Sequence, residues 1–358
     1  MILHPSGKRL VRKAVTLGIG LVGGLVALIV GAPLPWLIGA QLALCLVALS
    51  GIQILGGAPE WPQKSRSLFF PVLGVMIGAA FSADILREIP GWWPALIAVT
   101  LFLLVAQAVV YLLFRHVGGY DRATAFFSSF PGGFVEAAVL GREAGAIERL
   151  VTLQHFLRVS LIVLLMPLIF WALSGHRVGS AAGLPTSDVN LTLGSATLLV
   201  AAGLIGSFIG PWLRFPAPEV SGPLSVSAVF HSAGLIEGSI PPIMLSLTQL
   251  VIGTSLGVGF VGIAGREFMR GVGLALAAFA LVLGLAACSA WLIAPALETP
   301  KEAIILAFVP GGLAEMSLIA LTLNLSVPFV ILIHFYRILF TLGVIPQLAR
   351  RVIDRSGA

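Results

Sequence analysis

Two stretches of this sequence decide its fold: FPGGFVEAAVLG at residues 130–141 and FVPGGLAEMSLIAL at residues 308–321. Each carries Pro-Gly-Gly and then, three residues later, a glutamate inside apolar sequence. A second matching stretch follows each of them, QHFLRVSLIVLLMP at 154–167 and IHFYRILFTLGVIP at 333–346. At a constant offset of 179, the interval 131–167 contains ten identities in 37 positions without a gap. The second half of the chain therefore repeats the first.

The composition indicates a protein that lies in a lipid bilayer. Of its 358 residues, 58% are hydrophobic and 10% are charged, and the mean hydropathy is +1.05. A soluble domain carries about 25% charged residues. The net charge of +6 does not indicate nucleic acid as a partner, because the basic residues lie in short runs between apolar segments. Cys45 and Cys288 lie inside apolar segments, so we expect no disulfide, metal site or cofactor.

The apolar segments predict an all-α polytopic membrane protein, since a spanning helix needs about 20 apolar residues. The predicted spans are 14–31, 35–56, 68–84, 92–114, 148–173, 191–213, 219–238, 241–263, 271–296 and 327–348. Two further stretches, 123–141 and 302–324, carry the Pro-Gly-Gly motifs. A Gly- and Ser-rich linker at 179–190 separates a first membrane repeat, 1–178, from a second, 191–358.

The distribution of lysine and arginine predicts how the two repeats are oriented. If all twelve stretches cross the membrane, 13 Lys and Arg residues face inward and six face outward. If each Pro-Gly-Gly stretch instead enters and leaves on one side, 16 face inward and only Arg87, Arg177 and Lys301 face outward. The second arrangement fits the positive-inside rule better. Five spans per repeat is an odd number, so the repeats would be inverted, as in secondary transporters. Both termini would then be cytoplasmic.

The Pro-Gly-Gly motifs predict broken helices at Pro131, Gly132 and Gly133 and at Pro310, Gly311 and Gly312. Proline removes a backbone donor, and glycine opens backbone angles that other residues avoid. Lipid cannot satisfy the freed backbone groups, so each break must be buried in protein or line a wet cavity. The alternative is a kink that only helps the helices to pack.

Three charged or titratable residues occur twice in register, and they are the candidate site. Glu136 and Glu315 lie near the first turn after each break, where a carboxylate either caps its helix or binds a proton or cation. The permanently charged Arg158 and Arg337 lie deep in apolar helices, so each must face a carboxylate, a backbone terminus or an anionic ligand. Two alternatives are open for the arginines. Each forms a structural ion pair with Glu136 or Glu315, or the arginines form an anion site. His155 and His334, three residues before the arginines, are candidate proton-coupling groups.

The duplicated motifs resemble those of the AbrB family of bacterial membrane proteins, which is distinct from the small soluble transition-state regulator of the same name. The resemblance covers nearly the whole chain and implies a duplicated inner-membrane protein. Family members carry labels such as regulator of gene expression and ammonia monooxygenase. No nucleotide-binding, zinc-protease or hydrolase motif is present, so we expect no enzyme.

The sequence therefore favours a secondary transporter for a small, anionic solute, with the two broken helices and the paired charges around its site. The alternative is a non-transporting membrane regulator that acts through a partner or by sensing a ligand. A homo-oligomer is an open alternative to a monomer.

Overall fold

The computed structural model describes residues 5–62, 64–132, 134–174, 192–236, 240–263 and 265–354. Within these ranges the chain is helical, and the only strand-like feature is an isolated bridge between Ile54 and Gly57. The first half contains α1 (Pro5–Ile29), α2 (Pro35–Leu49), α3 (Lys64–Gly78), α4 (Ala83–Glu88), the 3-10 turn η1 (Ile89–Trp92), α5 (Trp93–Leu112), the π-helical turn η2 (Leu113–Val117), α6 (Arg122–Ser129), α7 (Phe134–Glu143) and α8 (Glu148–Ser174). The second half contains α9 (Leu193–Trp212), α10 (Pro218–Ser232), α11 (Pro242–Val258), α12 (Gly265–Leu297), α13 (Lys301–Phe308), α14 (Leu313–Thr322) and α15 (Val327–Asp354).

The prediction of an all-α protein with membrane-spanning helices is confirmed. In the part of the chain that the structure describes, five helical segments are long and apolar enough to cross a bilayer: Gly7–Ile29, Ala83–Val117, Glu148–Leu173, Leu193–Trp212 and Phe268–Leu297. Shorter apolar helices occupy four of the other five predicted spans, at Pro35–Leu49, Ser67–Gly78, Ile243–Val258 and Val327–Thr341. The fifth, 219–238, corresponds to α10 (Pro218–Ser232), which is not one of these apolar helices. Inversion of the two repeats stays a prediction.

Helix boundaries recur between the two halves. Adding 179 to the bounds of α6 and α7 gives the bounds of α13 and α14, and adding 183 to those of α2 gives those of α10. The turns recur as well. Leu34 and Ala217 both adopt a left-handed backbone, with φ of 45° and 47°, directly before the proline that begins α2 or α10. This conformation costs about 1–2 kcal/mol for a residue with a Cβ atom, so its occurrence at two equivalent positions reflects a duplicated backbone path.

The helices form two compact units, and each unit takes helices from both halves. The first unit contains 1–83, 164–264 and 321–324, and the second contains 84–163, 265–320 and 325–358. The division of the sequence into repeats at 178 and 191 stays a prediction, and the linker 179–190 lies outside the described residues.

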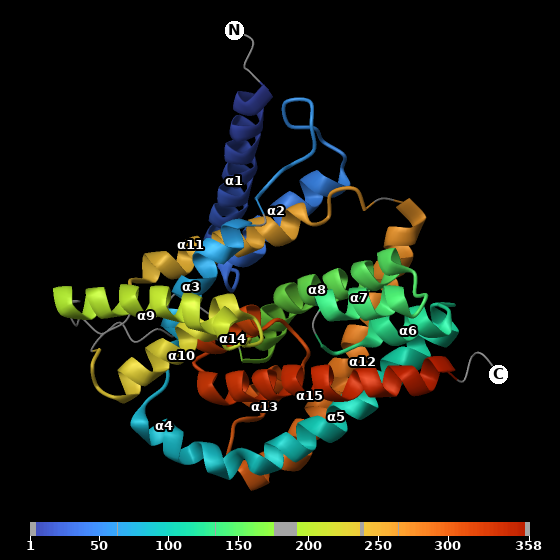
Figure 1. Cartoon of the computed structure of the whole chain (residues 1–358). Helices are drawn as coiled ribbons and strands as arrows, with labels where there is room; N and C mark the ends of the chain where they lie inside the picture. Colours follow the sequence, from blue (N-terminus) through green and yellow to red (C-terminus); the bar gives the residue numbers. More distant parts are fainter. Residues whose placement is uncertain are drawn as a thin grey trace. The chain divides into compact units, whose positions relative to one another are not determined.

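In the first unit, equivalent helices make equivalent contacts. Helix α2 packs against α1 and α11, and α10 packs against α9 and α3 (Figure 1). The α1–α2 crossing depends on glycine, because a Cβ atom on Gly23 would collide with the carbonyl oxygen of Gly39. At the equivalent α9–α10 crossing, a Cβ on Gly222 would collide with the carbonyl oxygen of Gly206. Such close approach of backbones at small residues is typical of membrane helices.

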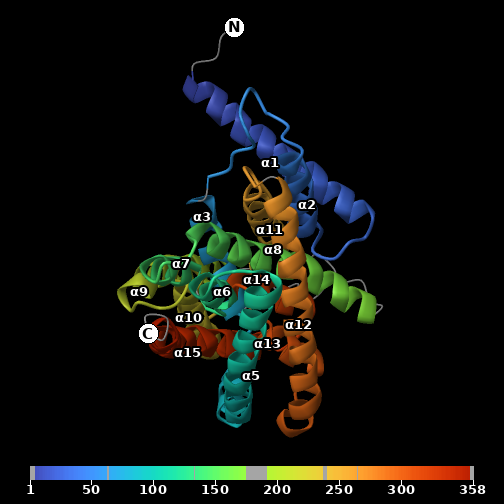
Figure 2. The same cartoon turned by 90° about the vertical axis from the view of Figure 1, so that its right-hand side faces the viewer.

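The second unit contains both proline breaks. In this unit, α5 and α12 run alongside each other (Figure 2). Helix α13 packs between α12 and α15, and α6 contacts α5, α7 and α15. Edge-to-face packing of Trp92 on Phe329, with ring centroids 5.3 Å apart, joins α15 to the turn before α5. The candidate site lies inside this unit.

Candidate functional site

The first Pro-Gly-Gly motif lies at the tip of a helical hairpin. A Cβ atom on Gly141 of α7 would lie 3.2 Å from the Phe127 ring of α6. In one continuous helix these residues would be about 21 Å apart. At the open end of the hairpin, the Thr124 hydroxyl accepts a hydrogen bond of 2.8 Å from the backbone N–H of Ile147. The chain therefore turns back at the motif, and the two ends of the segment lie side by side.

The second motif separates α13 from α14 at the equivalent positions. A Cβ atom on Gly311 would collide with the Met316 side chain, and one on Gly312 would collide with the Glu315 carboxylate. The carboxylate of Glu315, which is buried, thus lies beside the N-terminal end of its own helix. A negative charge is favoured at that position by the helix dipole.

The two equivalent arginines bind the backbone on both sides of the proline in the same repeat, Pro131 for Arg158 and Pro310 for Arg337. Arg158 donates from Nη1 to the carbonyl of Phe130 at 2.6 Å and from Nη2 to that of Gly132 at 3.5 Å. Arg337 donates to the carbonyl of Val309 at 3.3 Å and to that of Gly311 at 2.6 Å. The four carbonyls are equivalent at the offset of 179. Of the partners expected from the sequence, the backbone terminus is the one that both arginines contact.

This pairing follows from the chemistry of a broken helix. The break leaves carbonyl groups without their usual helical donors, and the planar guanidinium offers several donors in a fixed fork. The Nε atoms of Arg158 and Arg337 are buried without a hydrogen-bond partner among the described residues. The two guanidiniums also lie close enough to repel each other. The breaks therefore create a positively charged region in apolar surroundings.

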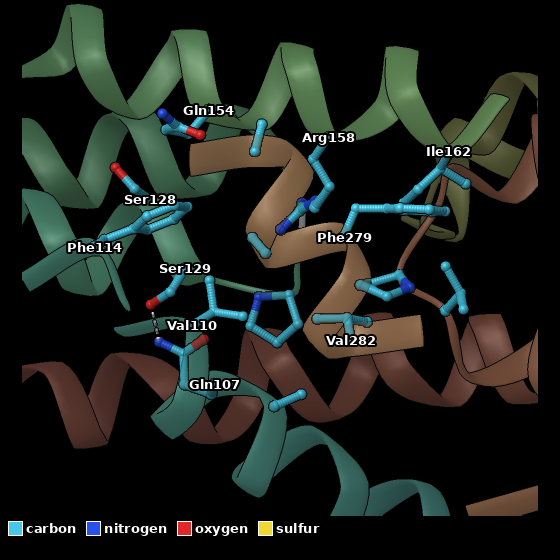
Figure 3. Close-up of a pocket in the computed structure, with 16 residues that line it drawn as sticks. Gln107, Val110, Phe114, Ser128, Ser129, Gln154, Arg158, Ile162, Phe279 and Val282 are labelled. Atoms are coloured by element: carbon cyan, nitrogen blue, oxygen red, sulfur yellow. Dashed lines mark hydrogen bonds between the residues drawn. The ribbon is translucent and has the colours of Figure 1, made fainter. Parts of the chain in front are cut away.

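A small cavity lies between the two breaks. Its volume is about 40 Å³, room for roughly three water molecules. Pro131 and Pro310 both line it, together with apolar side chains of α5, α8 and α12 (Figure 3). Its polar lining consists of Gln107, Ser128, Ser129, Gln154 and Arg158. Among the lining residues that the structure describes, Arg158 is the one ionised side chain.

The structure places the residues predicted from the sequence in different settings. Pro131, Arg158 and Pro310 line the cavity, whereas the other described candidates do not. Those others are Gly132, Gly311, Gly312, Glu315, Arg337, His155 and His334. Gly133 and the side chain of Glu136 lie outside the described part of the structure. The binding roles of all these residues stay predictions.

The two histidines are buried against backbone. His155 Nε2 lies 3.0 Å from the carbonyl oxygen of Phe127, and His334 Nδ1 lies 2.9 Å from that of Val330. His155 therefore ties α8 to α6, while His334 bonds within α15. Their role in proton coupling is not tested by these contacts. Across the described ranges, no three His, Cys, Asp or Glu side chains gather in a way that could hold a metal ion.

Four polar lining residues, Ser128, Ser129, Gln154 and Gln107, are not among the candidates from the sequence. The candidates from the sequence are charged or titratable residues that occur in both halves, whereas these polar residues occur in one half. At the offset of 179, the second half has Ala307, Phe308, Ile333 and Ala286 in their places. Polar residues found in one half alone were the signal that could have identified the cavity.

Comparison with known proteins places the chain among relatives of similar length. The family described as "Transition state regulatory protein AbrB" matches residues 9–353. The Bacillus subtilis (strain 168) protein "Uncharacterized protein YhjN" is 26% identical, over 93% of this chain and 91% of its own length. The Escherichia coli (strain K12) protein "Putative regulator AbrB" is also 26% identical, over 90% of this chain and 91% of its own length.

Proposed function

This chain belongs to the AbrB family, and we propose that it is a secondary transporter of a small anionic solute, without enzymatic activity, in the bacterial inner membrane. The observation that carries the proposal is the cavity between two broken helices, lined by both prolines and by Arg158. Broken helices that meet around a solute site are the usual arrangement in secondary transporters.

The charge of the cavity supports an anionic solute. Arg158 is positively charged, its Nε has no partner among the described residues, and the described part of the lining contains no carboxylate. The nearby Arg337 adds to the positive potential. A charge in apolar surroundings is costly unless it is compensated, so a bound anion would be stabilised there.

The hairpin supports the proposed topology. Because α6 and α7 turn back on each other, the first Pro-Gly-Gly segment is suited to enter and leave on one side of the membrane. Five spans per repeat then give inverted repeats, with both termini in the cytoplasm. Arg142 and Arg149 would lie on the cytoplasmic side, while the equivalent stretch 321–328, which has no charge, would lie outside.

Transport by the purified full chain in proteoliposomes tests the proposal. The probes are radiolabelled small monocarboxylates and amino acids, because the cavity has a volume of about 40 Å³. We expect uptake that falls at least about tenfold in Arg158→Gln, since one lost charged contact is worth more than 1.4 kcal/mol. Arg87→Gln is the matched control, because Arg87 is exposed and pairs with the exposed Asp84. Equal uptake by Arg158→Gln and wild type would refute this assignment.

A membrane regulator is the second candidate, and the names of the family and of the Escherichia coli relative favour it. A regulator that senses a ligand would bind the same probes without moving them. Binding by the purified chain with no flux of any probe would therefore favour the regulator over the transporter.

A further inference from the structure

The amide groups of two glutamines at the cavity have fixed orientations. Gln107 donates from Nε2 to the carbonyl of Phe126 at 3.2 Å and to the hydroxyl of Ser129 at 2.9 Å. A backbone carbonyl can only accept a hydrogen bond, so the nitrogen must face it. The amide oxygen of Gln107 is consequently turned to the other side.

Gln154 is held in the same way from the opposite wall. Its Nε2 donates to the hydroxyl of Tyr120 at 2.9 Å and to the carbonyl of Gly271 at 3.4 Å. The carbonyl of Gly271 again excludes the flipped amide. Figure 3 shows both glutamines at the cavity, with the Gln107 nitrogen joined to Ser129.

Both amide oxygens are buried, and neither has a hydrogen-bond partner within the described residues. A buried acceptor without a donor is unfavourable, so each oxygen requires a donor from whatever fills the cavity. The Ser128 hydroxyl, also buried without a partner in the described structure, can donate or accept. The cavity thus presents two fixed acceptors beside the positive charge of Arg158.

This combination restricts the ligand. An anion without a donor, such as sulfate or a simple carboxylate, satisfies Arg158 but places its oxygens against two amide oxygens. A carboxylate with an adjacent amino group satisfies Arg158 and can donate to both amide oxygens, and a carboxylate with an adjacent hydroxyl satisfies Arg158 and donates to one of them. Phe279 and Val282 line the same cavity and leave an apolar surface for a small side chain.

We infer that the solute is a small monocarboxylate with a hydrogen-bond donor beside the carboxylate, one of the smallest 2-hydroxy or 2-amino acids. This inference rests on the proposed function, because it assigns a ligand to the same cavity. Gln107 and Gln154 are its specificity-determining residues, and Arg158 holds the carboxylate.

The second half of the chain supplies matched replacements. Ala286 stands at the position equivalent to Gln107, and Ile333 at that equivalent to Gln154. Gln107→Ala and Gln154→Ile therefore introduce residues that the same fold already carries in the other repeat. Gln154→Met, which keeps the length of the side chain without its amide, serves if Gln154→Ile does not fold.

The experiment is calorimetric titration of the purified full chain in detergent with lactate, alanine, propionate and sulfate. A site built for a polar substituent discriminates strongly against an analogue that lacks it, so lactate or alanine should bind at least about tenfold more tightly than propionate. In Gln107→Ala and in Gln154→Ile or Gln154→Met, the difference should fall to about threefold or less while propionate binding is retained.

The outcomes separate this inference from the proposed function. Wild-type binding of propionate or sulfate that equals or exceeds binding of lactate and alanine overturns the inference and leaves the anion site standing. Full discrimination in the glutamine variants also overturns it. Failure of all four probes to bind wild type overturns the anion site together with the inference.

Discussion

Arg337 donates a hydrogen bond of 2.6 Å to the carbonyl oxygen of Gly311. Gly311 directly follows Pro310, the proline that separates α13 from α14. Arg158 makes the equivalent pair of contacts in the other repeat, but it also faces the cavity. Arg337 is 3% exposed and is absent from the cavity lining. One interaction has thus been duplicated, and in one copy the arginine has a surface left for a ligand.

This difference predicts that Arg337→Gln reduces stability more than Arg158→Gln does. Removal of the buried Arg337 leaves the carbonyls of Val309 and Gly311 without donors, a loss of about 1–3 kcal/mol. Arg337→Lys should be intermediate, since lysine lacks the fork that reaches both carbonyls. The measurement is thermal unfolding of the detergent-solubilised variants. Unfolding temperatures that fall equally in the two glutamine variants would contradict the division of roles.

The glycine crossing of α1 and α2 predicts a second effect on stability. Gly23→Ala places a methyl group against the carbonyl of Gly39 and should destabilise the protein by about 1–3 kcal/mol, because the backbones must move apart.

Gly18→Ala on the same helix is the control. A Cβ atom there meets nothing within 4 Å, and replacing a helical glycine by alanine stabilises by about 0.5–1 kcal/mol. Opposite shifts in unfolding temperature are therefore expected for the two variants. A Gly23→Ala protein as stable as wild type would show that the crossing tolerates the methyl group.

Much of the fold could be predicted from the sequence because the duplication left strong marks. Pro-Gly-Gly breaks a helix wherever it lies, and the long apolar stretches could only be buried or lipid-facing helices. The partner of Arg158 could not be predicted, since a carboxylate, a carbonyl and an anion all satisfy a guanidinium and only the tertiary structure selects among them. The distribution of lysine and arginine favours a first Pro-Gly-Gly stretch that enters and leaves on one side, and α6 and α7 do fold back on each other.

Most of the polar residues of the cavity could not be predicted from the sequence, for a different reason. The residues that both halves share, such as the arginines at the breaks, maintain the fold that both halves have in common. Gln154 and Ser128 were missed because Ile333 and Ala307 replace them in the other half. In a duplicated fold, the polar residues of a site can come mainly from one half. The specificity of the site then depends on the residues that differ between the two halves.

The inverted topology predicts that equivalent hairpin entrances lie on opposite sides of the membrane. Arg122 at the start of α6 and Lys301 at the start of α13 are both exposed. In a Cys45→Ala, Cys288→Ala background, a membrane-impermeant maleimide should label Arg122→Cys from the cytoplasmic side and Lys301→Cys from outside. Labelling of both from one side would show parallel repeats.

The most direct test of the central claim is the accessibility of Ser128 in the cavity from each side of the membrane. In the same cysteine-free background, Ser128→Cys should react with a membrane-impermeant thiol reagent applied in separate experiments from either side, because a transporter exposes its site alternately. Lactate or alanine should slow both reactions. Reaction from one side only, whatever the ligand, would contradict alternating access and favour a ligand-sensing regulator.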